Sequence, residues 1–144
     1  MSHWNSSTPQ YRIQRWMEFR ADIAGMELRE QAAATAQYFR DFPLGARSVD
    51  YYDPLTWPTP WEILHHKTYC RSSGGILMHD TLVIINKCAT VELALIDDSQ
   101  DVYLAPLIEN SSILNMVLGE ISNLASHPEV KIIQRFQDEA PRQF

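Results

Sequence analysis

The sequence predicts an α+β fold, with helices in the first half of the chain and an antiparallel sheet in the second. Apolar residues recur at three- and four-residue spacing between about 10 and 40, as on one face of a helix. A helix start and a long apolar run follow between about 57 and 85. After Lys87 apolar and polar residues alternate, which is the period of a strand. Helices followed by consecutive strands are typical of the α+β class.

The first element is a long helix over residues 9–42, after a flexible lead-in at 1–8. No proline interrupts it between about 10 and 40, and Gly25 is its only glycine there, so one helix or two helices joined near Gly25 both fit. The apolar face that includes Trp16 packs on the core of its own domain in the simplest interpretation. The alternative is that this helix docks on a partner protein.

An aromatic loop follows the proline that ends this helix, Pro43. Its rings should hold the loop against the core. Together with Trp16 and the next helix, this aromatic segment supplies the candidate contact residues: Trp16, Tyr51, Tyr52, Trp57 and Trp61.

The best-defined helix start is the run Thr59-Pro60-Trp61-Glu62. Thr59 fits the N-cap, Pro60 fits the first helical position and Glu62 can complete a capping box. These residues predict a short helix at about 60–66. The apolar run that follows Cys70 then predicts a buried helix at about 71–86, with two glycines in its first turns where another backbone can approach.

Three or four antiparallel strands complete the fold. Strands are expected at about 90–96, 102–107, 113–118 and 130–136, and the tail after 136 should be loose. Pro106 implies an edge or an irregularity in the second strand. No linker or repeat divides the chain, so residues 1–144 form a single domain whose α+β core covers 43–144.

Composition excludes several classes of function. The net charge is −6 without any basic run, which argues against a nucleic-acid partner. No apolar run is long enough to span a bilayer, and the first residues lack the apolar stretch of a signal peptide. The only two cysteines, Cys70 and Cys88, are too few for a disulfide framework. No nucleotide-binding or metal-binding motif occurs, so no cofactor and no metal are expected.

Cys70 is the candidate catalytic residue. A thiol at the start of a buried helix lies at the positive end of the helix dipole, which favours the thiolate. A nucleophilic cysteine usually needs a histidine base, yet His79 would point away from Cys70 on a continuous helix and no histidine occurs between 80 and 126. The alternative is that Cys70 is a small buried hydrophobic residue, the commonest state of a free cysteine.

The segments TPWEILHHKTYCRSSGGILM, TVELALID and DVYLAPLI resemble the core of the transglutaminase-like (papain-like) superfamily. The resemblance implies that Cys70 corresponds to the nucleophile, while histidine and aspartate would come from the following strands. The strand at 90–96 has no histidine, so the resemblance implies a degenerate, non-catalytic relative.

The segment WPTPWEIL, the cysteine and apolar helix after it and a late ILN resemble small proteins of tailed phages, especially marine and cyanobacterial ones. This resemblance implies a virion or assembly component.

We therefore expect a non-enzymatic structural or assembly protein that acts through protein partners or as a homo-oligomer, such as a phage virion component. It would lie in the cytoplasm of an infected cell or in the virion. One alternative is a cysteine hydrolase or acyltransferase with Cys70 as the nucleophile. Another is a small acidic regulator that binds a host protein.

Overall fold

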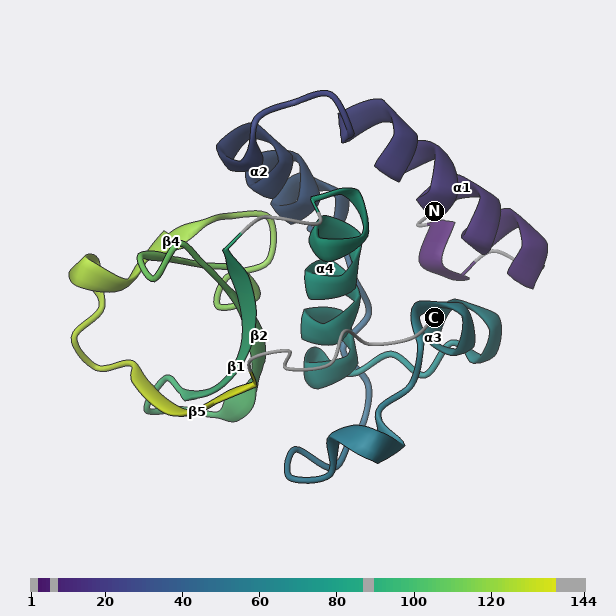
Figure 1. Ribbon diagram of the computed structural model, residues 1–144. Coiled ribbons are helices and arrows are strands. Elements are labelled where there is room, and N and C mark those ends of the chain that lie inside the picture. The colour runs from purple at the N-terminus through teal and green to yellow at the C-terminus, as the bar shows by residue number, and fades with distance from the viewer. Residues whose placement is uncertain (1–2, 6–7, 87–89, 137–144) are drawn as a thin grey trace.

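The computed structural model describes residues 3–5, 8–86 and 90–136 (Figure 1). Cys88, parts of the predicted lead-in and the predicted loose tail lie outside the described residues. The elements, in chain order, are η1 (His3–Asn5), α1 (Pro9–Ile23), α2 (Leu28–Tyr38), η2 (Pro54–Thr56), α3 (Pro60–His66), α4 (Arg71–Ile85), β1 (Val91–Asp97), β2 (Val102–Ile108), β3 (Ser112–Ile113), β4 (Ser122–Asn123), η3 (Leu124–Ser126) and β5 (Lys131–Phe136).

The α+β prediction is confirmed, with one strand more than expected. The sheet is antiparallel with the order β4-β3-β2-β1-β5, and four α-helices lie on one side of it, with α4 in direct contact. Figure 1 shows α4 between the sheet and the layer of α1, α2 and α3. Because α4 contacts β1 and β2 on one side and α2 and α3 on the other, it is buried from Ser72 to Leu82. No helix in the described part of the chain is both long enough and apolar enough to cross a membrane.

The N-terminal helical segment consists of two helices. Thr8 caps α1 by accepting a hydrogen bond from the Tyr11 N–H at 3.2 Å. The chain turns after Ile23, and the Gln31 side chain of α2 donates to the Ile23 carbonyl at 3.0 Å. The end of α1 is therefore satisfied by α2 itself, which fixes the break near Gly25.

An aromatic cluster joins η1 to the rest of the core. Trp4 is fully buried, and its ring lies 5.0 Å from the Phe42 ring and 6.1 Å from the Tyr69 ring. The Tyr69 hydroxyl donates to the Trp4 carbonyl at 2.6 Å. Phe42 in turn packs on Gly74 of α4, where an added Cβ would lie 2.8 Å from the ring. The aromatic cluster thus connects the first described residues to the first turn of α4.

The predicted capping box of α3 is confirmed. The Glu62 N–H donates to the Thr59 hydroxyl at 3.2 Å, and the Thr59 N–H donates to the Glu62 carboxylate at 3.0 Å. Lys67 then adopts a left-handed conformation with φ 53°, which ends α3 and turns the chain toward α4. The local sequence therefore determines both the start of α3 and the position of Cys70 at the start of α4.

The strand predictions hold for β1, β2 and β5, but the third strand is shorter than expected. Only Ser112 and Ile113 pair in β3, because the chain turns at Asn115, whose φ is 75°. Pro106 lies opposite Leu93 of β1, and β3 pairs with β2 only from Leu107 onward. At Pro106, β2 is therefore in regular register with β1 but not with β3. Proline, which has no N–H to donate, is accommodated at such a position.

Candidate active site

Cys70 is the N-cap residue of α4 and is 2% exposed. Its N–H donates to the Ser73 hydroxyl at 2.8 Å, and the Ser73 N–H donates to the Cys70 sulfur at 3.4 Å. Cysteine and serine thus form a reciprocal cap of the kind that a capping box makes. This cap holds the sulfur beside the free N–H groups at the positive end of a 15-residue helix.

The hydrogen bonds around the sulfur favour its ionised form. Burial raises the pKa of the Cys70 thiol, but hydrogen bonds from Ser48 and Ser73 lower it more, so the pKa lies below its ordinary value. The Ser48 hydroxyl donates to the sulfur at 3.6 Å. A cysteine with a lowered pKa has a larger thiolate fraction at neutral pH, and the thiolate is the nucleophilic form.

A pocket of about 300 Å³ adjoins Cys70. Three segments form it: the loop before η2, the start of α4, and the β1–β2 turn with the start of β2. The residues that line it are Gly45, Arg47, Tyr51, Cys70, Arg71, Ser72, Asp101, Val102 and Tyr103. The loop approaches closely at Gly45, whose N–H donates to the Tyr69 carbonyl at 3.0 Å, and an added Cβ would lie 2.7 Å from that oxygen.

Arg71, next to Cys70, holds one wall of this pocket. Its guanidinium lies 3.7 Å from a carboxylate oxygen of Asp98 and 3.7 Å from one of Asp101. It also donates to the Met116 carbonyl at 2.7 Å and lies 3.6 Å from the centre of the Tyr103 ring. The positive charge of Arg71 is therefore neutralised by the carboxylates of Asp98 and Asp101.

Asp98 is held in its ionised form by this wall. Burial raises the pKa of the Asp98 carboxyl, but hydrogen bonds from the Gln100 and Asp101 N–H groups and the Tyr103 hydroxyl, with the charge of Arg71, lower it further than burial raises it. The Tyr103 hydroxyl donates to Asp98 at 2.8 Å, and burial raises the pKa of Tyr103. Tyr103 thus keeps its proton while it supports the charged wall.

The strand residues that share the pocket with Cys70 are Val102 and Tyr103 of β2. Sequence reasoning looked for a histidine in the strand at 90–96, which is β1, but no residue of β1 lines the pocket. The hairpin instead brings the start of β2 to the N-terminus of α4, where the Ser72 hydroxyl accepts from the Leu104 N–H at 3.2 Å.

All five histidines belong to the described residues, and none of them lines the Cys70 pocket. His79 is buried within α4, with Nδ1 3.0 Å from the Asp80 carboxylate. His65 and His66 lie exposed at the end of α3, and His127 pairs with Glu129 at 2.9 Å. The thiol therefore has the two serines, and no imidazole, as hydrogen-bond partners in this pocket.

The five predicted contact residues lie in different environments. Trp16 is fully buried and its indole donates to the Thr81 hydroxyl at 2.9 Å, while Trp57 is also buried. Trp61 and Tyr51 are half-buried, and Tyr52 is 66% exposed. Their use as a contact surface stays a prediction, in which only Tyr52 presents most of its side chain to solvent.

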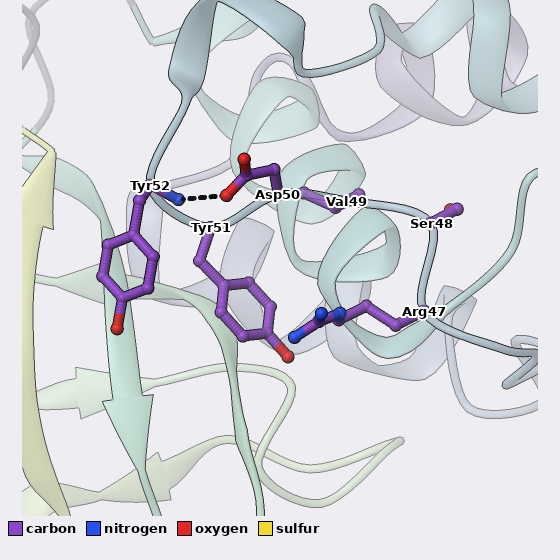
Figure 2. Close-up of a pocket in the computed structure, with 6 residues that line it drawn as sticks. All are labelled: Arg47, Ser48, Val49, Asp50, Tyr51 and Tyr52. Atoms are coloured by element: carbon purple, nitrogen blue, oxygen red, sulfur yellow. Dashed lines mark hydrogen bonds between the residues drawn. The ribbon is translucent and has the colours of Figure 1, made fainter.

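A second pocket, of about 500 Å³, adjoins the first. It is lined by the consecutive residues Arg47, Ser48, Val49, Asp50, Tyr51 and Tyr52 (Figure 2). Arg47 and Tyr51 line both pockets. Sequence reasoning identified Cys70 and Tyr51 but missed Arg47, Ser48 and Tyr103, because no local motif marks residues that tertiary packing alone brings to the thiol.

Cys70 lies at the start of a central helix that packs on an antiparallel sheet, as the resemblance to the transglutaminase-like superfamily predicts. The predicted resemblance to that superfamily is confirmed for the fold.

Solved structures of LapG from Legionella pneumophila show the likeness over most of the chain. One has a TM-score of 0.73 and 16% identity, with 91% of this chain and 77% of that chain covered. The structure of the EGTA-treated form has a TM-score of 0.73 and 16% identity, with 91% of this chain and 75% of that chain covered. The structure of the calcium-bound form has a TM-score of 0.72 and 14% identity, with 93% of this chain and 78% of that chain covered. No protein-family model matches the chain, and no curated protein matches it in sequence.

These matches correct the functional expectation. The prediction of a non-enzymatic structural or assembly protein is wrong, because the chain shares its fold with a cysteine protease and the enzymatic alternative fits that finding better. The prediction of a viral, phage or virion protein is wrong as well, since the matches give it no support. The residues that suggested a phage protein include a capping box, whose chemistry is common to helix starts of any origin.

Proposed function

We propose that this chain is a cysteine-dependent acyl-transfer enzyme, a hydrolase or an acyltransferase, with Cys70 as the nucleophile. The observation that carries the proposal is the Cys70 thiol itself, whose pKa is lowered by Ser48 and Ser73 and which lines a pocket. The fold supports it, because LapG, a cysteine protease, has a similar fold.

The reaction would proceed in two steps. In the first, the Cys70 thiolate attacks the carbonyl carbon of the acyl donor, a C–S bond forms, and the leaving group departs with its electron pair. In the second, water or another nucleophile attacks the Cys70 thioester, loses a proton to solvent, and releases the acyl group as the thiolate re-forms.

The lowered pKa of Cys70 takes over part of the task that a histidine base performs in other cysteine enzymes. No imidazole in the pocket is placed to protonate a departing amine. Acyl donors that release a stable anion, such as thioesters and activated esters, are therefore the substrates that this site favours.

The residues beside Cys70 do not fit a calcium ion, although one of the LapG structures is calcium-bound. Calcium prefers several oxygen ligands, but Asp98 and Asp101 are both paired with the Arg71 guanidinium. No group of three or more metal-binding side chains occurs in the described part of the chain. We therefore derive no step through calcium for this chain.

Chemical modification tests the proposal directly. We expect iodoacetamide to label Cys70 at neutral pH faster than it labels a free thiol such as glutathione, with peptide mapping to separate Cys70 from Cys88. An activated ester such as p-nitrophenyl acetate should acylate Cys70 and release a burst of nitrophenol. Cys70→Ala should abolish both signals with an unchanged circular dichroism spectrum, whereas Cys88→Ser should retain them. If Cys70 reacts more slowly than glutathione and forms no acyl adduct, the proposal is wrong.

A further inference from the structure

We propose that the Cys70 site selects acyl donors that carry a carboxylate, and that Arg47 is the residue that binds this carboxylate. The inference rests on the proposed function and names a substrate class for the same site. Three observations carry it: the position of Arg47 between two pockets, the absence of an ion-pair partner for Arg47 among the described residues, and the contrast with Arg71.

Arg47 lies where the two pockets meet. The Cys70 pocket and the larger pocket both include Arg47 and Tyr51 in their linings. Figure 2 shows these two side chains extending toward each other, and the guanidinium lies 5.0 Å from the centre of the Tyr51 ring. A ligand that reaches Cys70 within the smaller pocket would therefore pass within contact of the guanidinium.

Tyr51 holds Arg47 in this position. The Tyr51 hydroxyl donates to the Val102 carbonyl of β2 at 2.7 Å, which anchors the ring on the sheet. A hydrogen bond with Tyr51 raises the pKa of Arg47, with smaller contributions from the charges of Asp50 and Cys70. The guanidinium is therefore charged, and it is directed toward the pocket by an anchored side chain.

The two arginines of the Cys70 pocket differ in how their charge is used. Arg71 is balanced by Asp98 and Asp101. Arg47 has no ion pair within the part of the chain that the structure describes, and the nearby Asp50 uses one carboxylate oxygen to accept from the Tyr52 N–H at 3.0 Å. The exposed Arg47 guanidinium thus presents its donors to a ligand, and a planar carboxylate is the group that fits this fork of donors.

Two small alkylating agents test this inference, because they share one reactive carbon and differ in charge. Iodoacetate carries a carboxylate and iodoacetamide carries a neutral amide of nearly equal size. The measured quantity is the ratio of the iodoacetate rate to the iodoacetamide rate at Cys70. It is compared with the same ratio for glutathione. Since both agents need the same thiolate, this ratio is independent of the thiol pKa.

We expect the ratio at Cys70 to exceed that of glutathione by about fivefold, as an exposed ion pair allows. Arg47→Gln should bring the ratio to the glutathione value, and Arg47→Lys should retain part of the preference. Arg15→Gln, which removes an exposed charge on α1 outside both pockets, should leave the ratio unchanged.

A ratio equal to that of glutathione in the unmodified chain, or one unaffected by Arg47→Gln, overturns the inference. These results are distinct from failure of the proposed function, which would appear as slow reaction of Cys70 with both agents.

Discussion

At the scale of single residues, two serines donate hydrogen bonds to the Cys70 sulfur. Ser73 is close in sequence and acts through the helix cap, whereas Ser48 reaches the sulfur from a loop 22 positions earlier. Ser48 contributes to the low pKa without being part of the cap, so its effect can be measured separately from the stability of α4.

Ser48→Ala should raise the pKa of Cys70, because it removes the hydroxyl hydrogen bond that stabilises the charged sulfur, while the Ser48 backbone bond remains. The measurement is the rate of iodoacetamide labelling as a function of pH. Its midpoint should lie below that of a free cysteine and move upward in the variant. Ser126→Ala on the exposed η3 is the control. An unchanged midpoint in Ser48→Ala would show that Ser48 does not stabilise the thiolate.

The same pKa shift links stability to pH. Because the pKa of folded Cys70 is lowered, the thiolate stabilises the folded state above the pKa of the unfolded thiol, and this contribution is lost as the pH falls through the folded pKa. Cys70→Ala should remove this part of the pH dependence in denaturant titrations. If the pH dependence of the two proteins is identical near the folded pKa, the thiol contributes no such linkage.

At the scale of secondary structure, the close approach of α4 to β2 limits what the helix can contain. An added Cβ at Gly75 would lie 2.0 Å from the Leu104 carbonyl oxygen, an atom of the backbone that cannot rotate away. This approach also lets Ser72 bond to the Leu104 N–H. The helix therefore carries Cys70 to the end of the sheet only because a glycine follows within its first turns.

Gly75→Ala should lower the free energy of unfolding by about 3 kcal/mol, since either the helix or the strand must move. Gly25→Ala is the matched control, because nothing lies within 4 Å of its added Cβ. Urea denaturation measures both. Equal stability of the two variants would contradict this packing of α4 on β2.

Loss of the α3 cap should lower the free energy of unfolding less than Gly75→Ala does. Thr59→Ala should lower the free energy of unfolding by about 1 kcal/mol, because the Glu62 N–H loses its acceptor. Thr59→Ser keeps a hydroxyl at the same position and should retain most of the stability. Thermal unfolding followed by circular dichroism would measure both, and a midpoint for Thr59→Ala equal to that of the unmodified chain would argue against this cap.

At the scale of the whole molecule, buried polar bonds hold the helical layer together. Arg12 of α1 is 2% exposed and donates to the Leu64 carbonyl at 2.7 Å and to the His65 carbonyl at 3.0 Å. These carbonyls belong to the last turn of α3, where the negative end of the helix favours a cation. One arginine thus joins the first long helix to the segment that leads to Cys70.

Arg12→Met should lower the free energy of unfolding by about 2 kcal/mol, because carbonyl groups in the last turn of α3 lose a charged donor. Arg15→Met, three positions along α1 and exposed, should change it little. A comparable loss in both variants would mean that the effect arises from helix charge and not from the contact with α3.

Features that depend on interactions between residues close in sequence could be predicted, and features that depend on packing of distant segments could not. The start of α3, the buried α4 and the β1–β2 hairpin depend on caps and on periodicity within a few residues, and the sequence predicted them. The helix start also identified Cys70. Arg47, Ser48 and Tyr103 come together only through packing of separate segments, so no local pattern indicates them. The functional prediction was wrong because it took the missing histidine as decisive, whereas neither the Ser48 contact with the sulfur nor the pocket beside Cys70 can be read from the sequence.

The buried Trp4 has a consequence for anyone who prepares this protein. Its ring contacts Phe42, and Phe42 packs on Gly74 in the first turn of α4, the helix that Cys70 caps. An aminopeptidase that removed the first five residues would therefore excise part of the core beside Cys70. Purified material should therefore be checked by intact mass before thiol kinetics are interpreted.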